Sequence, residues 1–338
     1  MIKIIKPGLL STIQDKGRHG FQKDGVVVSG AMDTVSFRIA NLLVGNDENA
    51  AAIEVTLLGP VVMFLQDAFI SICGADFPAS IDGEGIPLWA TIFVRKGSKL
   101  RFGSTHTGCR AYLAVAGGFQ IETIMESKST YLRAKLGGLH GRALDVEDEI
   151  SFEPPNERIT KLLSIYTKKS LKLPFIKMKW SISFNSFSHS RAPKRIRVLE
   201  GEQFDFFSQV NQLALFSQPF TISTEADRMG YRLSGNKLYV NSSESMVSEA
   251  IPVGTIQVPP DGNPIILLAD RQTIGGYPKI GQVACIDLPA VAQLKPGDTL
   301  SFVKIDLETA QRKLLDKERQ LTELKHAISF KFEEEVSS

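Results

Sequence analysis

The chain has 338 residues, of which 43% are hydrophobic and 22% are charged, as is typical of a soluble globular protein. Its 39 basic and 37 acidic side chains nearly balance, so charge does not indicate nucleic acid or a membrane surface as a partner. The three cysteines, Cys73, Cys109 and Cys285, are dispersed and odd in number, which argues against a disulfide framework and a zinc cluster. The N-terminus shows no continuous apolar run of the signal-peptide type, and we expect a cytoplasmic protein that binds no metal.

Short runs rich in Val, Ile and Phe recur between turn-forming residues, and this pattern predicts a mainly β protein. The clearest runs lie at residues 61–64, 70–73, 92–94, 111–116 and 265–268. One helix is predicted over residues 34–44, because Asp33 can cap its N-terminus and its apolar residues share one face. A second, shorter helix is predicted at residues 288–294.

The C-terminal segment 306–328 has the pattern of an amphipathic helix, with apolar residues spaced three, four or seven apart. These residues are Leu307, Ala310, Leu314, Leu321, Leu324 and Ile328. Two interpretations stay open, since the apolar face can pack against the chain's own domains or bind a partner. The last residues, 333–338, are predicted to form a frayed tail.

A weak internal repeat indicates two related β domains. Three pairs of segments recur in the same order, namely 11–16 with 223–228, 52–55 with 250–253, and 96–102 with 296–302. The predicted organisation is an N-terminal β domain (1–154), a connector rich in Lys, Ser and Pro (155–190), a C-terminal β domain (191–304), and a helix with its tail (305–338).

Several catalytic and cofactor motifs are absent from the sequence, including the Walker A phosphate loop, the dinucleotide-binding glycine fingerprint, the zinc-protease motif and the serine-hydrolase elbow. Residues 176–179, Ile-Lys-Met-Lys, only loosely echo the Ala-Met-Lys-Met hairpin of biotin carriers and lack its turn, which argues against biotin on this chain. His19 and His106 have no nucleophile or carboxylate near them in sequence, so loop histidines are the favoured interpretation.

Two clusters combine polar residues with glycine. The first, residues 29–36, contains Ser29 and Asp33 and leads into the predicted helix, where free N–H groups can bind an anion. Alternatively, Asp33 is only the helix cap. The second, residues 227–235, contains Arg228 and Tyr231 and suits recognition of a carboxylate or phosphate by a planar guanidinium. The alternative is an Asp–Arg ion pair that holds a turn.

A third cluster follows the apolar strand at residues 265–269. If both faces of this strand are buried, it delivers Asp270, Arg271 and Gln272 to its end, where a ligand pocket commonly forms. The adjacent Gly275 and Gly276 would let backbone N–H groups approach a ligand. Three further polar residues from the flanking turns could converge on the same place, and these are Asp261, Asn263 and Lys279.

Together these motifs resemble the biotin-dependent carboxyltransferase-like family, and more closely its branch of C components of bacterial 5-oxoprolinases, also known as KipA. The motifs that carry the resemblance are SGAMD from Ser29, GCRAYLAVAGGF from Gly108, GGLHGR from Gly137, DRMGYRLSG from Asp227 and the whole of residues 254–279. The resemblance covers about residues 4–302. It implies two cyclophilin-like β-barrel domains, a KipI-like B component as direct partner, and a further A component.

The resemblance also implies an activity, in which the assembly opens the lactam of 5-oxoproline to L-glutamate with ATP hydrolysis. In this reaction Arg228 or Arg271 would neutralise a phosphate or the substrate carboxylate, Gln272 would pair with the amide, and Asp270 would accept a proton. ATP would be shared with the rest of the complex. Two alternatives stay open, namely a KipA-like regulator that antagonises a KipI-like inhibitor of a histidine kinase, and a carboxyltransferase that moves a carboxyl group from carboxybiotin to an amide such as urea.

Overall fold

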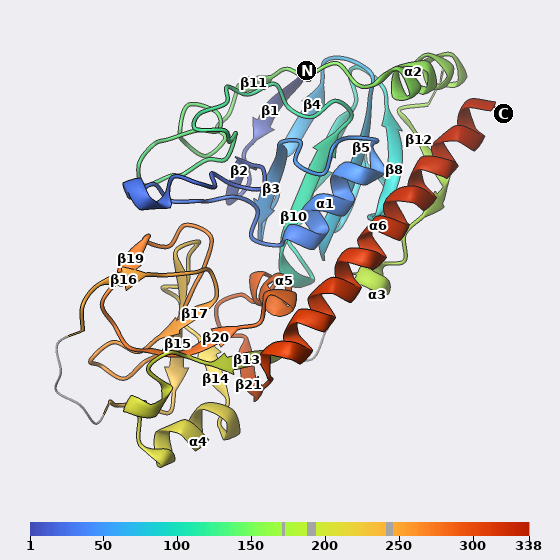
Figure 1. Cartoon of the computed structure of the whole chain (residues 1–338). Helices are drawn as coiled ribbons and strands as arrows, with labels where there is room; N and C mark the ends of the chain where they lie inside the picture. The colour runs from blue at the N-terminus through green and yellow to red at the C-terminus, as the bar shows by residue number, and fades with distance from the viewer. Residues whose placement is uncertain (171–172, 188–193, 241–245, 338) are drawn as a thin grey trace. The chain divides into compact units, whose positions relative to one another are not determined.

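The structure, a computed structural model, describes the whole chain except residues 171–172, 188–193, 241–245 and 338 (Figure 1). It contains two compact units. The first unit comprises Met1–Gly17, Asp33–Arg191 and Arg319–Ser338. The second comprises Arg18–Met32 and Ala192–Glu318.

The first unit is built from two antiparallel sheets that enclose a hydrophobic core. The first sheet has the strand order β11 (Glu149–Ile150), β1 (Ile2–Lys6), β4 (Val61–Phe64), β9 (Lys99–Phe102), β6 (Ala79–Ile81), β7 (Glu84–Gly85). The second has the order β12 (Phe175–Ser181), β8 (Ala90–Val94), β5 (Ala68–Asp76), β10 (Thr107–Val115), β3 (Ala52–Thr56), β2 (Leu10–Gln14). The strand predictions near residues 61, 70, 92 and 111 are confirmed.

Helix α1 (Thr34–Leu43) covers the outer face of the second sheet, which explains why β5 is buried along nearly its whole length. Ile70 and Ile72 point into the core between the sheets. Ser71, on the opposite face of β5, donates its hydroxyl hydrogen to the carbonyl of Ala40 in α1. A strand covered on both faces loses the polar–apolar alternation by which half-buried strands are recognised.

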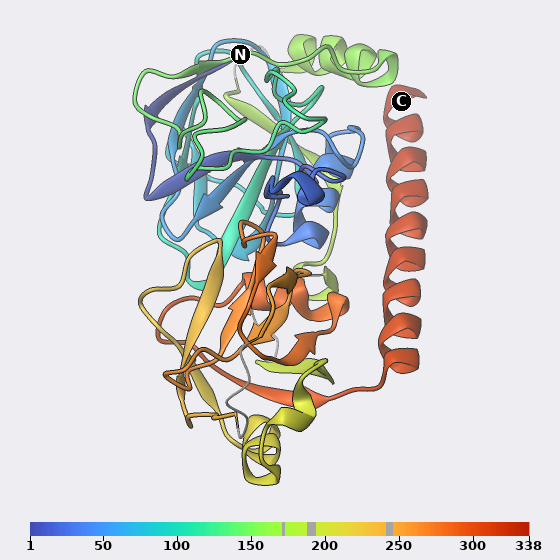
Figure 2. The same cartoon turned by 60° about the vertical axis from the view of Figure 1, so that its left-hand side comes forward.

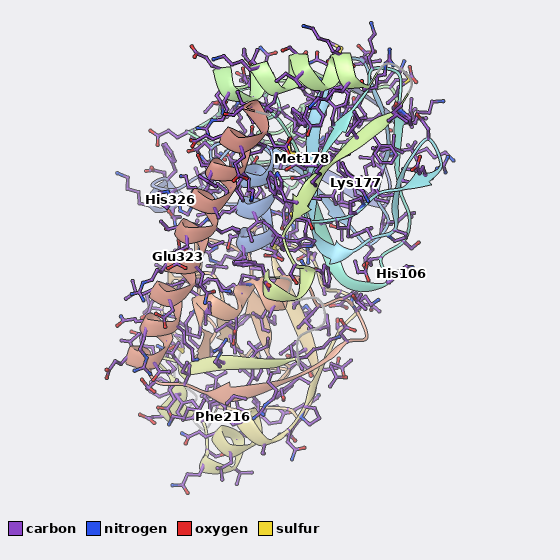
Figure 3. The ribbon with its side chains drawn as sticks, turned by 90° about the vertical axis from the view of Figure 1, so that its right-hand side faces the viewer. His106, Lys177, Met178, Phe216, Glu323 and His326 are labelled. Atoms are coloured by element: carbon purple, nitrogen blue, oxygen red, sulfur yellow. The ribbon has the colours of Figure 1, made fainter. Side chains whose placement is uncertain are left out.

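The region predicted as a connector contains ordered elements of the first unit. Helix α2 (Glu157–Lys169) buries Tyr166 against the rings of Phe69 and Phe93, and strand β12 pairs with β8. Figure 3 shows Lys177 and Met178 on β12, where Met178 is buried and Lys177 is exposed. The lysines of this strand lie on its solvent side, as expected for a half-buried edge strand. Because such a strand is rich in lysine, its composition resembled that of a linker.

The second unit is a closed barrel with the strand order β13 (Arg195–Glu200), β20 (Lys279–Val283), β17 (Thr255–Gln257), β18 (Ile265–Leu267), β15 (Gly230–Gly235), β14 (Phe220–Ile222), β21 (Thr299–Lys304). The parallel pairing of β13 with β21 closes it, and apolar side chains fill its interior. A separate two-stranded ribbon is formed by β16 (Glu249–Ala250) and β19 (Ile274–Gly275). The mainly β prediction is therefore confirmed.

Short helices surround the barrel. Helix α4 (Gln209–Ser217) lies beside β21, as Figures 1 and 2 both show, and α5 (Leu288–Ala292) confirms the short helix predicted at residues 288–294. Short 3-10 turns lie at Gln22–Asp24, Phe204–Phe206 and Cys285–Asp287. In the first unit, α3 (Phe184–Phe187) follows β12.

The C-terminal helix α6 (Leu307–Ser337) is longer than predicted. The prediction of a frayed tail at residues 333–338 is wrong for Glu333–Ser337, which continue the helix. The reason is local packing in the first unit, where Phe332 is buried beside Trp180 and Glu335 accepts a hydrogen bond from the hydroxyl of Tyr166 (2.9 Å). No helix within the described part of the chain is long and apolar enough to cross a membrane.

Two phenylalanines near the end of α6 give a matched test of this packing. Phe332 is 2% exposed and Phe330 is 59% exposed. Phe332→Ala should lower the free energy of unfolding of the first unit by about 3–5 kcal/mol, because it removes a buried ring. Phe330→Ala should change it by less than about 0.5 kcal/mol. Both tryptophans, Trp89 and Trp180, belong to this unit, so tryptophan fluorescence during urea unfolding is the measurement. Equal effects of the two substitutions would contradict the packing of the tail.

Candidate functional site

The candidate site lies at the end of β18, in the second unit. The strand is shorter than predicted and ends at Leu267, and only its central residue Ile266 is fully buried. The following residues form a turn whose backbone is tied to the segment before β15. Leu268 N–H donates to the carbonyl of Met229 (2.9 Å) and Asp270 N–H donates to that of Arg228 (2.8 Å). The polar side chains after the strand are thus held on a fixed backbone.

Asp270 and Arg228 form a buried bidentate ion pair. Nε of Arg228 donates to Oδ2 of Asp270 (2.9 Å) and Nη2 donates to Oδ1 (3.1 Å), and the two side chains are only 5% and 6% exposed. Nη2 of Arg228 also donates to the carbonyl of Gly30 (2.7 Å). An Asp–Arg ion pair that holds a turn was one expectation for residues 227–235, and Arg228 of that cluster does form an ion pair, with the distant Asp270.

The turn before β15 places Arg228 for this pairing. Oδ1 of Asp227 accepts hydrogen bonds from the backbone N–H groups of Met229 (2.8 Å) and Gly230 (3.2 Å). Gly230 then begins β15 and pairs with Leu267 of β18. Arg228 therefore sits in a tight turn beside the end of β18, although it is 42 residues from Asp270 in sequence.

Arg271 is buried, and backbone carbonyls hold its guanidinium. Its side chain is 8% exposed, Nε donates to the carbonyl of Ile251 (2.8 Å), and Nη1 donates to that of Leu268 (3.3 Å). Within the part of the chain that the structure describes, no acidic side chain lies within ion-pair distance of it. Burial lowers the pKa of the Arg271 guanidinium from its usual value, and the group nevertheless stays protonated at neutral pH.

Arg271 and Gln272 line a cavity of about 350 Å³, a volume within the range of small-molecule sites. All of its lining residues belong to the second unit, and they are Gln22, Val28, Ala250, Ile251, Pro252, Val253, Arg271, Gln272 and Thr273. Much of the wall comes from the segments that flank the ribbon β16–β19, residues 250–253 and 271–273. These segments are joined just beyond the ribbon pairs, where Ile251 N–H donates to the carbonyl of Thr273 (3.0 Å). Arg271 and Gln272 thus border a cavity close to the end of the apolar strand, and their role in ligand binding stays a prediction.

Gly275 packs closely against neighbouring side chains of the second unit. A Cβ atom at this position would lie 2.3 Å from Cδ1 of Ile251 and 3.1 Å from Nε2 of Gln257. A side chain at this position would require the end of the Ile251 side chain to move, so glycine lets the ribbon pack closely on Ile251. The carbonyl of Ile251 accepts the hydrogen bond from Arg271. Gly275 therefore has a packing role, and the approach of its backbone N–H to a ligand stays a prediction.

Ser29 lies next to the ion pair. Its N–H donates to the carbonyl of Ala269 (3.2 Å), and its backbone is in the left-handed region with φ of 57°. Its hydroxyl is buried and has no hydrogen-bond partner among the described residues. The neighbouring Val28 lines the same cavity as Arg271, and the carbonyl of the neighbouring Gly30 accepts a hydrogen bond from Arg228. Residues 28–30 therefore lie near both arginines.

Asp33 and Tyr231 serve local structure. Asp33 belongs to the first unit, where its carboxylate accepts from the N–H (3.0 Å) and hydroxyl (2.7 Å) of Ser36 and caps α1. The helix prediction is confirmed. Tyr231 is buried in the barrel core, and its hydroxyl donates to the carbonyl of Leu294 (3.1 Å). Neither residue lines the cavity.

The predicted convergence of Asp261, Asn263 and Lys279 on the strand end is not found, because none of them lines the cavity. Asp261 accepts from the backbone and side-chain nitrogens of Asn263 (both 3.1 Å), which closes a turn. Lys279 forms ion pairs with Glu202 (2.9 Å) and Glu249 (2.5 Å). Burial opposes the charge of Lys279, but these two carboxylates raise its pKa above the usual value.

Sequence reasoning missed the cavity residues that come from distant segments. Gln22 and Val28 belong to the excursion Arg18–Met32, and residues 250–253 follow β16. In the sequence, the segment 250–253 stands out only as part of the internal repeat. His19 and His106 are exposed, and the described residues contain no group of three or more His, Cys, Asp or Glu placed to hold a metal ion.

The chain belongs to the family described as carboxyltransferase domain, subdomain A and B, whose family model matches residues 24–304. It is 35% identical over 325 residues to the C component of 5-oxoprolinase from Escherichia coli (strain K12), a match that covers 96% of this chain and 97% of that protein. It is 33% identical over 324 residues to urea amidolyase of Saccharomyces cerevisiae, which covers 92% of this chain and 17% of that protein.

Among solved structures, the urea amidolyase of K. lactis resembles the chain with a TM-score of 0.84 and 28% identity, over 95% of this chain and 20% of that one. The mainly β fold described above is therefore shared with part of a much longer enzyme. The resemblance inferred from the sequence motifs is confirmed.

The two arginines should respond differently to removal of their charge. Arg228→Met leaves Asp270 buried and unpaired, and should lower the free energy of unfolding of the second unit by about 3–5 kcal/mol. Arg271→Met removes a buried cation that has no counter-charge among the described residues, and should have a much smaller effect. The double variant Arg228→Met/Asp270→Leu should recover most of the loss. Calorimetric unfolding measures all three, and a larger loss for Arg271→Met than for Arg228→Met would contradict these assignments.

Proposed function

We propose that this chain acts as the C component of an ATP-dependent 5-oxoprolinase complex, which opens the lactam of 5-oxoproline to L-glutamate. The observation that carries the proposal is the similarity to the E. coli 5-oxoprolinase C component along nearly the full length of both chains. The urea amidolyase similarity, in contrast, covers a small share of that enzyme. A role within a complex implies partner chains, which we propose to be a KipI-like B component and an A component.

The cavity beside Arg271 suits a small molecule that carries both a carboxylate and an amide. Arg271 provides the cation, and the side-chain amides of Gln272 and Gln22 provide donors and acceptors in the same wall. 5-Oxoproline has these two groups on one small ring. The lining of the cavity therefore supports binding of such a substrate.

The cavity by itself does not contain a complete catalytic apparatus. Both carboxylate oxygens of Asp270 accept hydrogen bonds from Arg228, so the proposed proton transfer to Asp270 would first require this pair to open. Asp270 itself does not line the cavity, and the described lining residues include no carboxylate and no histidine. We therefore assign the cavity to substrate binding and expect the chemical step to need groups from the partner chains.

The charge of the cavity argues against ATP as its ligand. A triphosphate carries several negative charges, whereas the lining residues provide one cation among apolar and neutral side chains. ATP activates the unreactive lactam in the proposed reaction, and the partner chains are the proposed place for its binding. This chain would contribute the fold and the substrate-binding cavity.

A second candidate function is supported by the family model and by the urea amidolyase structure. In it, the chain would be a carboxyltransferase that acts on an amide such as urea, with biotin on a carrier in another chain. Lys177, the lysine of the biotin-like tetrapeptide, lies within β12 opposite Ile92 and not in a hairpin turn.

Reconstitution separates the two candidate functions. The chain should be co-purified with the A and B components of the same organism, and ATP-dependent glutamate release from 5-oxoproline should be measured. We expect turnover by the assembly and almost none by the chain alone. ATP-dependent carboxylation of urea in the presence of a biotin carrier, without glutamate release, would favour the carboxyltransferase and contradict the 5-oxoprolinase assignment.

Arginine variants test the cavity within this assembly. Arg271→Lys keeps the charge but loses the planar fork, and should lower kcat/KM by about 10- to 100-fold, or about 1.4–2.7 kcal/mol. The matched control is Arg232→Lys, because Arg232 lies on β15 with 47% of its side chain exposed and pairs with Glu225. An Arg271→Lys assembly with unchanged kinetic constants would remove this cavity from the reaction.

A further inference from the structure

We propose that the cavity beside Arg271 binds one small carboxylate in this chain alone and rejects phosphate and nucleotides. The preference for one carboxylate follows from the charges in the cavity. Only the identification of that carboxylate as 5-oxoproline or glutamate rests on the proposed function. The inference assigns the nucleotide and the organic acid to different parts of the complex.

The first support is the charge count within the cavity wall. Among the described residues that line the cavity, Arg271 is the one with a charged side chain, and it is more than nine-tenths buried. A buried cation is destabilising unless an anion or several acceptors compensate it. One bound carboxylate brings the wall to neutrality, whereas a phosphate dianion or a triphosphate leaves excess negative charge in a poorly solvated place.

The surroundings of the cavity also disfavour polyanions. Glu249 precedes the lining residue Ala250 and pairs with Lys279, which in turn pairs with Glu202. Two carboxylates thus share one ammonium group, and this cluster carries a net negative charge. Lys279 is committed to these partners and is not available to a second phosphate group.

The hydrogen bonds of Arg271 favour a planar acceptor with two oxygens. An arginine side chain has five N–H donors, and the structure uses one on Nε and one on Nη1, which leaves three on the two terminal nitrogens. The terminal edge of a guanidinium matches a carboxylate through two parallel hydrogen bonds. Because both acceptors used are backbone carbonyls, the guanidinium is held in place before a ligand arrives.

The other lining residues indicate which chemical groups the ligand carries besides its carboxylate. Val28, Ile251 and Val253 give apolar surface, and Gln22 and Gln272 add neutral amide groups. This combination suits a short organic acid with an amide or amine group more than an inorganic anion. The volume of about 350 Å³ accommodates such a molecule.

The test is a binding titration of the purified chain, without its partner chains, by isothermal calorimetry at constant ionic strength. The probes are 5-oxoproline, L-glutamate, acetate, inorganic phosphate and ATP. We expect 5-oxoproline or glutamate to bind at least tenfold more tightly than phosphate or ATP, with acetate weaker than the larger acids. Arg271→Gln should weaken carboxylate binding at least tenfold, Arg271→Lys should weaken it less, and Arg232→Gln should bind like the natural chain.

Three results would overturn the inference. These are the absence of carboxylate binding at millimolar concentration, equal or tighter binding of phosphate or ATP, and carboxylate binding unaffected by Arg271→Gln in a chain with an unchanged circular dichroism spectrum. Measuring glutamate release by the complex separates a failure of this inference from a failure of the proposed function. Glutamate release by an assembly whose isolated chain binds no carboxylate contradicts only the inference, whereas carboxylate binding without such turnover contradicts only the proposed activity.

Discussion

The ion pair between Arg228 and Asp270 is the constraint on which the candidate site depends. It joins the turn before β15 to the turn after β18, and Arg228 also bonds the carbonyl of Gly30 from the N-terminal excursion. Three segments that are far apart in sequence are therefore fixed at one point. A pair buried this deeply is sensitive to loss of either partner, because the remaining charge cannot be solvated.

The same pair determines what Arg271 can do. Since Asp270 is fully engaged with Arg228, the adjacent arginine receives no carboxylate from its own turn, and two backbone carbonyls hold its guanidinium against the cavity. The two arginines thus divide structural and binding roles. Gly275 completes the arrangement by allowing the ribbon to approach Ile251, which supplies one of these carbonyls.

Much of the fold followed from local sequence patterns, as the strand Val61–Phe64 and the Asp33-capped helix show. The pairing of Arg228 with Asp270 could not be predicted, because it depends on the register of β15 against β18 across 42 residues. Asp261 was predicted to join a site because turns and ligand sites use the same residue types. Among the repeated segments, 96–102 and 296–302 do share a local structure, since each begins with a glycine turn and leads into a strand.

The division of roles between the two arginines is tested most directly by NMR of their Nε–H groups, assigned by substitution of each arginine and followed while 5-oxoproline is added. The account predicts that the Arg271 resonance shifts progressively and saturates. The Arg228 resonance should stay at a position set by its bond to Asp270. An unchanged Arg271 resonance at saturating ligand, or a shift confined to Arg228, would contradict the account.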